Sequence, residues 1–156
     1  MNHEIWHMAL MGLVVSALCP AGCAALLRLL PAAEAWTVPG WCALPLFVVL
    51  HAAVAVRSEH HHGGAVAHAL LVVGALLFWA PVLGTRHRLS DPGRTLYLYT
   101  ALPLLDLAGV WLVAAGRLAG GLAMIAGMLP MGAIAVVITW RWMCREEQAL
   151  GPQEET

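Results

Sequence analysis

Histidine and methionine are the residue types in this chain that most clearly predict chemistry. The 156 residues include eight histidines and seven methionines. His3 and His7 are four residues apart, as are Met124 and Met128, and positions four apart share one face of a helix. Imidazole and thioether groups are donors that suit Cu(I) better than hard oxygen ligands do. Each pair can therefore present two donors to one copper ion.

Five further histidines follow in the middle of the sequence. His60, His61 and His62 form a continuous run, and His68 follows His61 by seven residues, which is about two turns of a helix. His51 and His68 lie inside apolar segments, where an imidazole must find a partner and is a functional candidate by default. The run of three histidines has an alternative interpretation as a solvated loop. The rings of His51 and His68 can also be structural groups whose hydrogen bonds are satisfied.

Asp106 and two cysteines complete the set of candidate residues. Asp106 is the only carboxylate inside an apolar segment, and it can either orient a ligating histidine from the second shell of a metal site or be a protonated structural group. Cys19 and Cys23 are also four apart and lie on either side of Pro20. They either bind a metal ion on its way through the membrane or pack as small residues on a kinked helix.

The elements that must position these residues are membrane-spanning helices. Hydrophobic residues make up 61% of the chain and charged residues only 11%, against about 25% charge in soluble domains. Five apolar runs are long enough, or nearly so, to cross a bilayer: 5–27, 38–56, 65–83, 96–115 and 118–140. We predict an all-α, polytopic transmembrane helical bundle of about five spans. Four is the fallback, because Pro39 and Pro45 interrupt the second run.

The arginines predict the orientation of these spans. With five spans, six of the eight arginines fall on one side: Arg28, Arg86, Arg88, Arg94, Arg141 and Arg145. The positive-inside rule makes that side cytoplasmic, so the N-terminus is outside and the C-terminus inside. Residues 1–144 then form the bundle and 145–156 a short polar cytoplasmic tail. All histidines except His87 fall in the outer half, and we expect a multi-pass protein of a cell membrane, the bacterial plasma membrane.

The charge balance excludes one class of partner. All the basic residues are arginine and the formal net charge is -1, so no basic field exists to hold a nucleic-acid backbone. The predicted partner is membrane lipid.

Several ordered motifs resemble a known family. The first is His3-Glu4-Ile5-Trp6-His7-Met8, which precedes a helix reaching Pro20. The second is His51, followed by His68 and then by Phe78-Trp79-Ala80-Pro81-Val82-Leu83-Gly84. The third runs from Leu89-Ser90 to Arg94-Thr95-Leu96-Tyr97-Leu98-Tyr99, the fourth is Gly120-Gly121-Leu122-Ala123-Met124, and the last is a Trp-Arg-Trp and Arg-Glu-Glu ending. In this order they resemble the CtaG-type assembly factors of cytochrome c oxidase, which are polytopic membrane proteins. Family members usually have about seven spans, so the chain resembles a shortened member, with Gly64 where a second histidine is expected.

The resemblance implies a copper-handling function. It implies a binding and delivery protein, not an enzyme, that assists copper insertion or assembly of a haem-copper cytochrome c oxidase. Its partner would be an oxidase subunit or a copper donor protein. The Cu(I) ligands would come from this set: His3, His7, His51, His61, His68, Met124 and Met128. Neutral imidazole is the ligating form, so binding is expected to weaken below about pH 6.5.

Two other functions remain open on the sequence alone. In a b-type haem protein, His51 and His68 from neighbouring helices would supply the axial ligands. In a non-catalytic accessory subunit of a respiratory complex, the histidines would only be solvated. An acid–base enzyme is the least supported class, because no nucleophile lies beside a base and its orienter in the outer half.

Overall fold

A computed structural model describes residues 2–30, 38–57, 64–84 and 88–150, and only the backbone of residues 2–4, 57 and 150. These ranges contain helices and no strand. The helices are α1 (Asn2–Leu13), the π-helix η1 (Val14–Leu18), α2 (Cys19–Leu29), α3 (Gly40–Arg57), α4 (Gly64–Leu83), α5 (Asp91–Ala114) and α6 (Leu118–Leu150). The predicted all-α bundle is confirmed.

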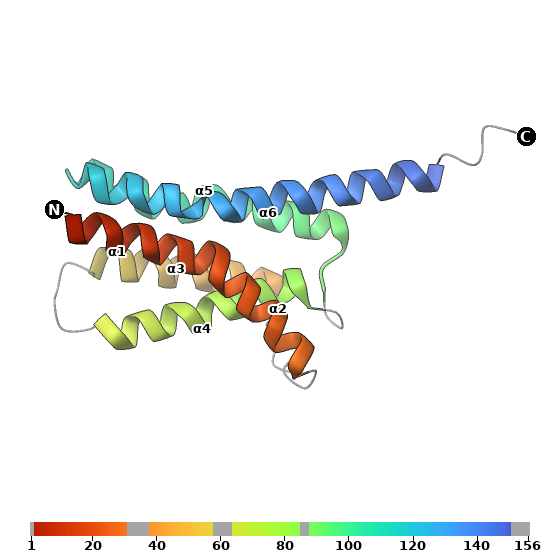
Figure 1. Cartoon of the computed structure of the whole chain (residues 1–156), viewed down its shortest axis with the longest axis horizontal. Helices are drawn as coiled ribbons and strands as arrows, with labels where there is room; N and C mark the ends of the chain where they lie inside the picture. The colour runs from red at the N-terminus through yellow and green to blue at the C-terminus, as the bar shows by residue number, and fades with distance from the viewer. Residues whose placement is uncertain (1, 31–37, 58–63, 85–87, 151–156) are drawn as a thin grey trace, which may run out of the picture.

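The helices run back and forth along one axis (Figure 1). The start of α1, the end of α3 and the start of α4 lie at one end of the bundle, and the junction of α5 and α6 lies there too. The opposite end holds the end of α2 and the start of α5, and α6 projects beyond it. This alternation is the one that five passes through a membrane require.

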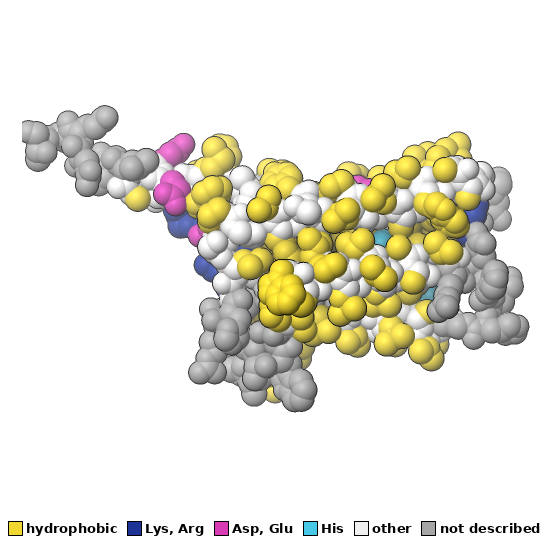
Figure 2. Space-filling view, turned by 180° about the vertical axis from the view of Figure 1, so that it is seen from behind, with side chains coloured by type: hydrophobic (Ala, Val, Ile, Leu, Met, Phe, Trp, Pro, Cys, Tyr) yellow, Lys and Arg dark blue, Asp and Glu magenta, His cyan; other side chains and the backbone are white. Residues whose placement is uncertain are grey.

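The outer surface is apolar along the length of the bundle. Four segments are long and apolar enough to cross a membrane: Ile5–Leu29, Gly64–Leu83, Asp91–Ala114 and Leu118–Ala149. Figure 2 shows hydrophobic side chains along the length of one face of the bundle and charged ones gathered mainly where α6 projects. Exposed leucine, valine and tryptophan side chains suit contact with lipid. The chain is therefore a multi-pass membrane bundle, while its orientation and the kind of membrane stay predictions.

The second pass is the shortest of the five, as the sequence predicted. Helix α3 has 18 residues, which corresponds to about 27 Å, and its apolar part is shorter than the other four. It begins directly after Pro39 and accommodates Pro45, an exposed residue, without breaking. Helix α3 packs on α4 and α5. These neighbours stabilise a helix that is short for a span and that loses a backbone hydrogen bond at Pro45.

The last helix is longer than the apolar run that predicted it. Helix α6 continues ten residues past 140, through the start of the expected polar tail, to Leu150. Residues 141–150 contain no glycine or proline, and most of them are good helix formers. The Trp142 indole also donates a hydrogen bond of 3.0 Å to Glu146, one turn later. The polar residues therefore extend the helix beyond the bundle.

The first pass is bent at η1, where the backbone changes register. The N–H of Cys19 donates to the carbonyl of Val14, five residues earlier. Pro20 has no N–H for the next carbonyl, that of Val15, and the Trp79 indole of α4 donates to that oxygen at 2.9 Å. The bend lets α1 pack on α6 while α2 packs on α4. One pass therefore contacts two neighbours in turn.

Close backbone contact joins α1 to α6. A Cβ atom on Gly127 would lie 2.7 Å from the carbonyl oxygen of Ala9 and 3.0 Å from Cα of Gly12. Ser16, near the same crossing, donates a 2.7 Å hydrogen bond to the Gly127 carbonyl. Small residues of this kind allow membrane helices to approach closely, where dispersion forces and interhelical hydrogen bonds replace the hydrophobic effect.

Replacing Gly127 by alanine tests this crossing. We expect Gly127→Ala to destabilise the protein by about 1–3 kcal/mol, because the added methyl group meets backbone atoms that cannot rotate away. Gly132→Ala is the matched control on the same helix, because a Cβ there meets nothing within 4 Å. Thermal unfolding in one detergent, followed by helical circular dichroism, measures both. Equal midpoints for the two variants would contradict the crossing.

Candidate metal site at one end of the bundle

Two of the predicted ligands, His7 of α1 and His68 of α4, meet in the structure. Their Nε2 atoms are 3.2 Å apart, and the ring centroids are 5.0 Å apart with the planes at 73°. The two residues are 61 positions apart in the chain. The sequence marked each as a candidate separately, and the packing of the first and third passes brings them together.

The contact of the second ring nitrogen of His68 indicates which nitrogen of each ring carries the hydrogen. Its Nδ1 contacts the carbonyl oxygen of Gly64, one turn earlier in α4. A carbonyl can only accept, so in the neutral ring Nδ1 carries the hydrogen and Nε2 keeps its lone pair. His7 must then donate its Nε2 hydrogen to His68. A backbone carbonyl that orients a ring in this way is the usual support of a metal-ligating histidine.

The spacing of the two Nε2 atoms also suits a metal ion. With metal–nitrogen distances of about 2.0–2.1 Å and a tetrahedral angle, two ligating nitrogens lie about 3.3–3.4 Å apart. The observed 3.2 Å is close to this value. A cation between the two Nε2 atoms would need little movement of either ring, with the ring hydrogen of His7 then on its Nδ1 so that both Nε2 lone pairs face the ion.

The three histidines whose side chains are described lie at similar depths from one end. His7 is five residues from the start of α1, His68 four from the start of α4, and His51 six from the end of α3, which are depths of about 6–9 Å. These helix ends lie together (Figure 1). The predicted gathering of histidines at one end therefore holds for these three. His61 and the side chain of His3 lie outside the described part of the chain.

His51 is separated from the pair by its surroundings. Its ring is fully buried and neither nitrogen has a hydrogen-bond partner. It packs on Phe47 at a centroid distance of 5.9 Å. Within the described ranges, no three histidine, cysteine, aspartate or glutamate side chains are grouped closely enough to hold a metal. The structure thus brings together a pair of predicted ligands and leaves a ligand role for His51 as a prediction.

The other predicted residues lie in or beside the apolar core. Met124 and Met128 of α6 are buried core residues, as are Met8 and Met11 of α1. Asp106 of α5 is half-buried, and its Oδ1 has no hydrogen-bond partner. No histidine contact of its carboxylate is found in the described structure, so its role as a second-shell orienter stays a prediction.

The cysteine pair favours one of its two interpretations. Cys19 and Cys23 are both buried and free, and the thiol of Cys23 donates to the carbonyl of Leu76 in α4 at 3.6 Å. Donation requires the protonated thiol, whereas a metal ligand is a thiolate. This contact supports packing between α2 and α4 over metal binding.

An aromatic cluster beneath His51 was not foreseen as part of the site. Phe47 stacks on Phe78 with centroids 5.0 Å apart, and Phe78 stacks on Tyr97 at 5.1 Å. The Tyr97 hydroxyl donates to the carbonyl of Phe78 at 3.0 Å. Phe78 and Tyr97 belong to the motifs quoted above and Phe47 does not, and the mutual contact of the three depends on how α3, α4 and α5 pack. The cluster holds the three helices in register below the histidines.

Comparison with models of protein families, with curated proteins and with solved structures finds no match for this chain. The resemblance described above therefore stays a resemblance of motifs. The arguments for function come from the geometry of the histidine pair and from the surrounding bundle.

Substitution of His51 tests whether its ring is without a partner in the folded bundle. We expect His51→Leu to stabilise the protein by about 1–2 kcal/mol, because two buried polar atoms without partners are replaced by an apolar side chain of similar size. His51→Ala is the control for volume and should destabilise it by about 2–3 kcal/mol through the cavity it leaves beside Phe47. Thermal unfolding in detergent measures both changes, and a marked loss of stability in His51→Leu would show that the ring has a partner.

Proposed function

We propose that the chain is a copper-handling membrane protein that binds Cu(I) between His7 and His68. It assists copper insertion into, or assembly of, a haem-copper cytochrome c oxidase. The observation that carries the copper site is the 3.2 Å approach of two Nε2 atoms, one of which has its lone pair directed by the Gly64 carbonyl. The oxidase as acceptor comes from the motif resemblance.

The donor chemistry favours Cu(I) over other ions. Hard cations such as Mg²⁺ and Ca²⁺ require six or more oxygen ligands, and a structural Zn²⁺ site closes with four nitrogen or sulfur ligands. Imidazole and thioether donors suit the softer Cu(I), and at the tetrahedral spacing of the two Nε2 atoms the ion takes its remaining ligands from other donors at this end of the bundle. Methionine supplies such thioethers on both helices that cross at this end, with Met8 and Met11 on α1 and Met124 on α6.

The position of the pair suits delivery of the ion. The contact between the two rings is only partly buried, and it lies about 6–8 Å from the ends of α1 and α4. Copper held there can pass by ligand exchange to an acceptor at the membrane surface. We place this end on the outside of a bacterial plasma membrane, with an oxidase subunit or a copper donor protein as partner. The chain acts as a binding and delivery protein in this mechanism.

Titration of the purified protein with Cu(I) tests the site. Under anaerobic conditions and against a chromogenic chelator, the wild type should bind one equivalent tightly. His7→Ala and His68→Ala should each weaken that binding at least tenfold, because each removes one of two oriented ligands. Protons compete for the same lone pairs, so the affinity should fall as the pH is lowered.

Two variants separate this site from other histidines. His51→Leu should keep the tight equivalent, and a variant with alanine at 60, 61 and 62 should keep it too. Loss of tight binding only in the triple variant would show that the histidine run is the copper site and would overturn the pair. The copper content of the oxidase, in cells carrying His68→Ala, then tests the acceptor separately from the binding.

A further inference from the structure

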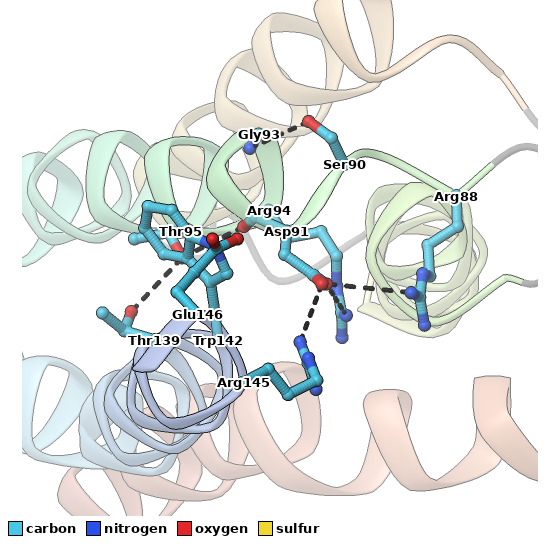
Figure 3. A network of polar contacts seen from close by, with 10 residues as sticks. All are labelled: Arg88, Ser90, Asp91, Gly93, Arg94, Thr95, Thr139, Trp142, Arg145 and Glu146. Atoms are coloured by element: carbon cyan, nitrogen blue, oxygen red, sulfur yellow. Dashed lines mark hydrogen bonds and ion pairs between the residues drawn. The ribbon is translucent and has the colours of Figure 1, made fainter. Parts of the chain in front are cut away.

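A charged cluster lies at the end of the bundle opposite the histidine pair. Asp91 begins α5 and is contacted by three arginines (Figure 3). Arg145 of α6 reaches its Oδ2 at 2.7 Å, Arg94 reaches its Oδ1 at 3.1 Å, and Arg88 lies 3.7 Å from Oδ1. We call Arg88, Arg94 and Arg145 the arginine cluster. It draws on α5, α6 and the segment before α5.

The arginine cluster holds more positive charge than Asp91 neutralises. Three guanidinium groups and one carboxylate carry a net charge of +2. Each guanidinium has five N–H donors, and the contacts with Asp91 use few of them. The Nε of Arg94 is buried and has no hydrogen-bond partner. The nearby carboxylate of Glu146 accepts from the Trp142 indole, and with that carboxylate counted the formal net charge of the group is still positive, at +1.

Exposure leaves two of the three guanidinium groups able to reach a ligand. The side chains of Arg88 and Arg145 are 47% and 54% exposed, whereas that of Arg94 is only 13% exposed. All three guanidinium groups lie within 3.7 Å of the Asp91 carboxylate, so their charges are gathered at one place. Guanidinium groups bind phosphate through paired hydrogen bonds, and oriented arginines are suited to that geometry.

The level of the arginine cluster is that of a membrane interface. It lies where the apolar span of α5 begins, beside the part of α6 that carries Trp140 and Trp142. Tryptophan is enriched at this depth. Trp140 and Met143 are large exposed hydrophobic side chains at this depth, on the side of α6 roughly opposite Arg145, and they indicate that lipid surrounds this part of the helix. A phosphate at this depth is that of a lipid headgroup, and this level favours a phospholipid over a soluble anion.

We propose that the arginine cluster binds the phosphate of an anionic phospholipid. The phosphate lies against Arg88 and Arg145 next to Asp91, and the acyl chains run along α6. The arginine bias predicts that this end is cytoplasmic, where the leaflet is negatively charged and attracts basic groups. The proposal is independent of copper binding at the other end. It adds a lipid ligand that anchors α5 and α6.

Lipid binding by the whole chain tests the proposal. Protein purified in detergent is titrated with phosphatidylglycerol or with phosphatidylcholine, and bound lipid is counted by native mass spectrometry. We expect phosphatidylglycerol to bind the wild type at least tenfold more tightly than phosphatidylcholine does. Arg145→Gln and Arg88→Gln should each reduce that affinity by about tenfold, as expected for the loss of a charge-assisted hydrogen bond. Arg88→Gln disturbs the folded structure less than Arg145→Gln does, because the contact of Arg88 with Asp91 is the longest of the three.

Arg141→Gln is the matched control, because it removes the same charge one turn earlier on α6. It should leave the preference for phosphatidylglycerol unchanged. An equal loss in Arg141→Gln would show only general attraction of charge and would overturn the site. Competition by millimolar inorganic phosphate that abolishes lipid binding would assign the site to a soluble phosphate and overturn the lipid. No preference between the two lipids would overturn the proposal altogether.

Discussion

The backbone of a membrane helix must satisfy its hydrogen bonds within the protein, because lipid offers no partners. In the first pass this constraint is severe at Pro20, which cannot donate to the carbonyl of Val15. The indole of Trp79 fills that vacancy from α4, and the bend at η1 turns α2 toward α4 and α1 toward α6. The same approach of the first and third passes places His7 against His68.

Polar side chains inside the bundle divide into those with a partner and those without one. Ser16, Cys23 and Tyr97 each donate to a backbone carbonyl of another helix, so they stabilise specific crossings. His51 and Asp106 each keep a buried polar atom without a partner, which costs free energy and adds nothing to packing. Packing and hydrogen bonding within the bundle therefore do not explain why His51 and Asp106 are present.

The passes were predictable because hydrophobicity and helix punctuation are local properties of the sequence. The apolar runs match the helices closely, but α5 begins earlier than its run, at Asp91, and α6 continues beyond its run to Leu150, since the runs marked the apolar parts and not the helix ends. The site was only partly predictable. Spacing four residues apart pairs His7 with His3, whose side chain lies outside the described part of the chain, so that pairing stays a prediction. The contact that the structure describes is with His68, and no local pattern encodes a contact between positions 61 apart. Such pairing depends on how the whole first pass packs: α1 lies against α6, where Gly127 allows close approach, and η1 and α2 lie against α4.

The two ends of the bundle place different demands on the helices between them. At one end the rings of His7 and His68 meet with their Nε2 atoms 3.2 Å apart, and Nδ1 of His68 contacts a carbonyl within its own helix. At the other end Asp91 of α5 pairs with Arg94 of the same helix and with Arg145 of α6. This ionic contact adds to a packing of α5 on α6 in which Gly109 and Gly121 already bring the two backbones close together. Both ends of the bundle carry basic residues, because Arg57 ends α3 and Arg117 precedes α6 at the histidine end. The two ends differ in the groups that meet there: two imidazole nitrogens from the first and third passes at one end, and guanidinium groups around a carboxylate at the other.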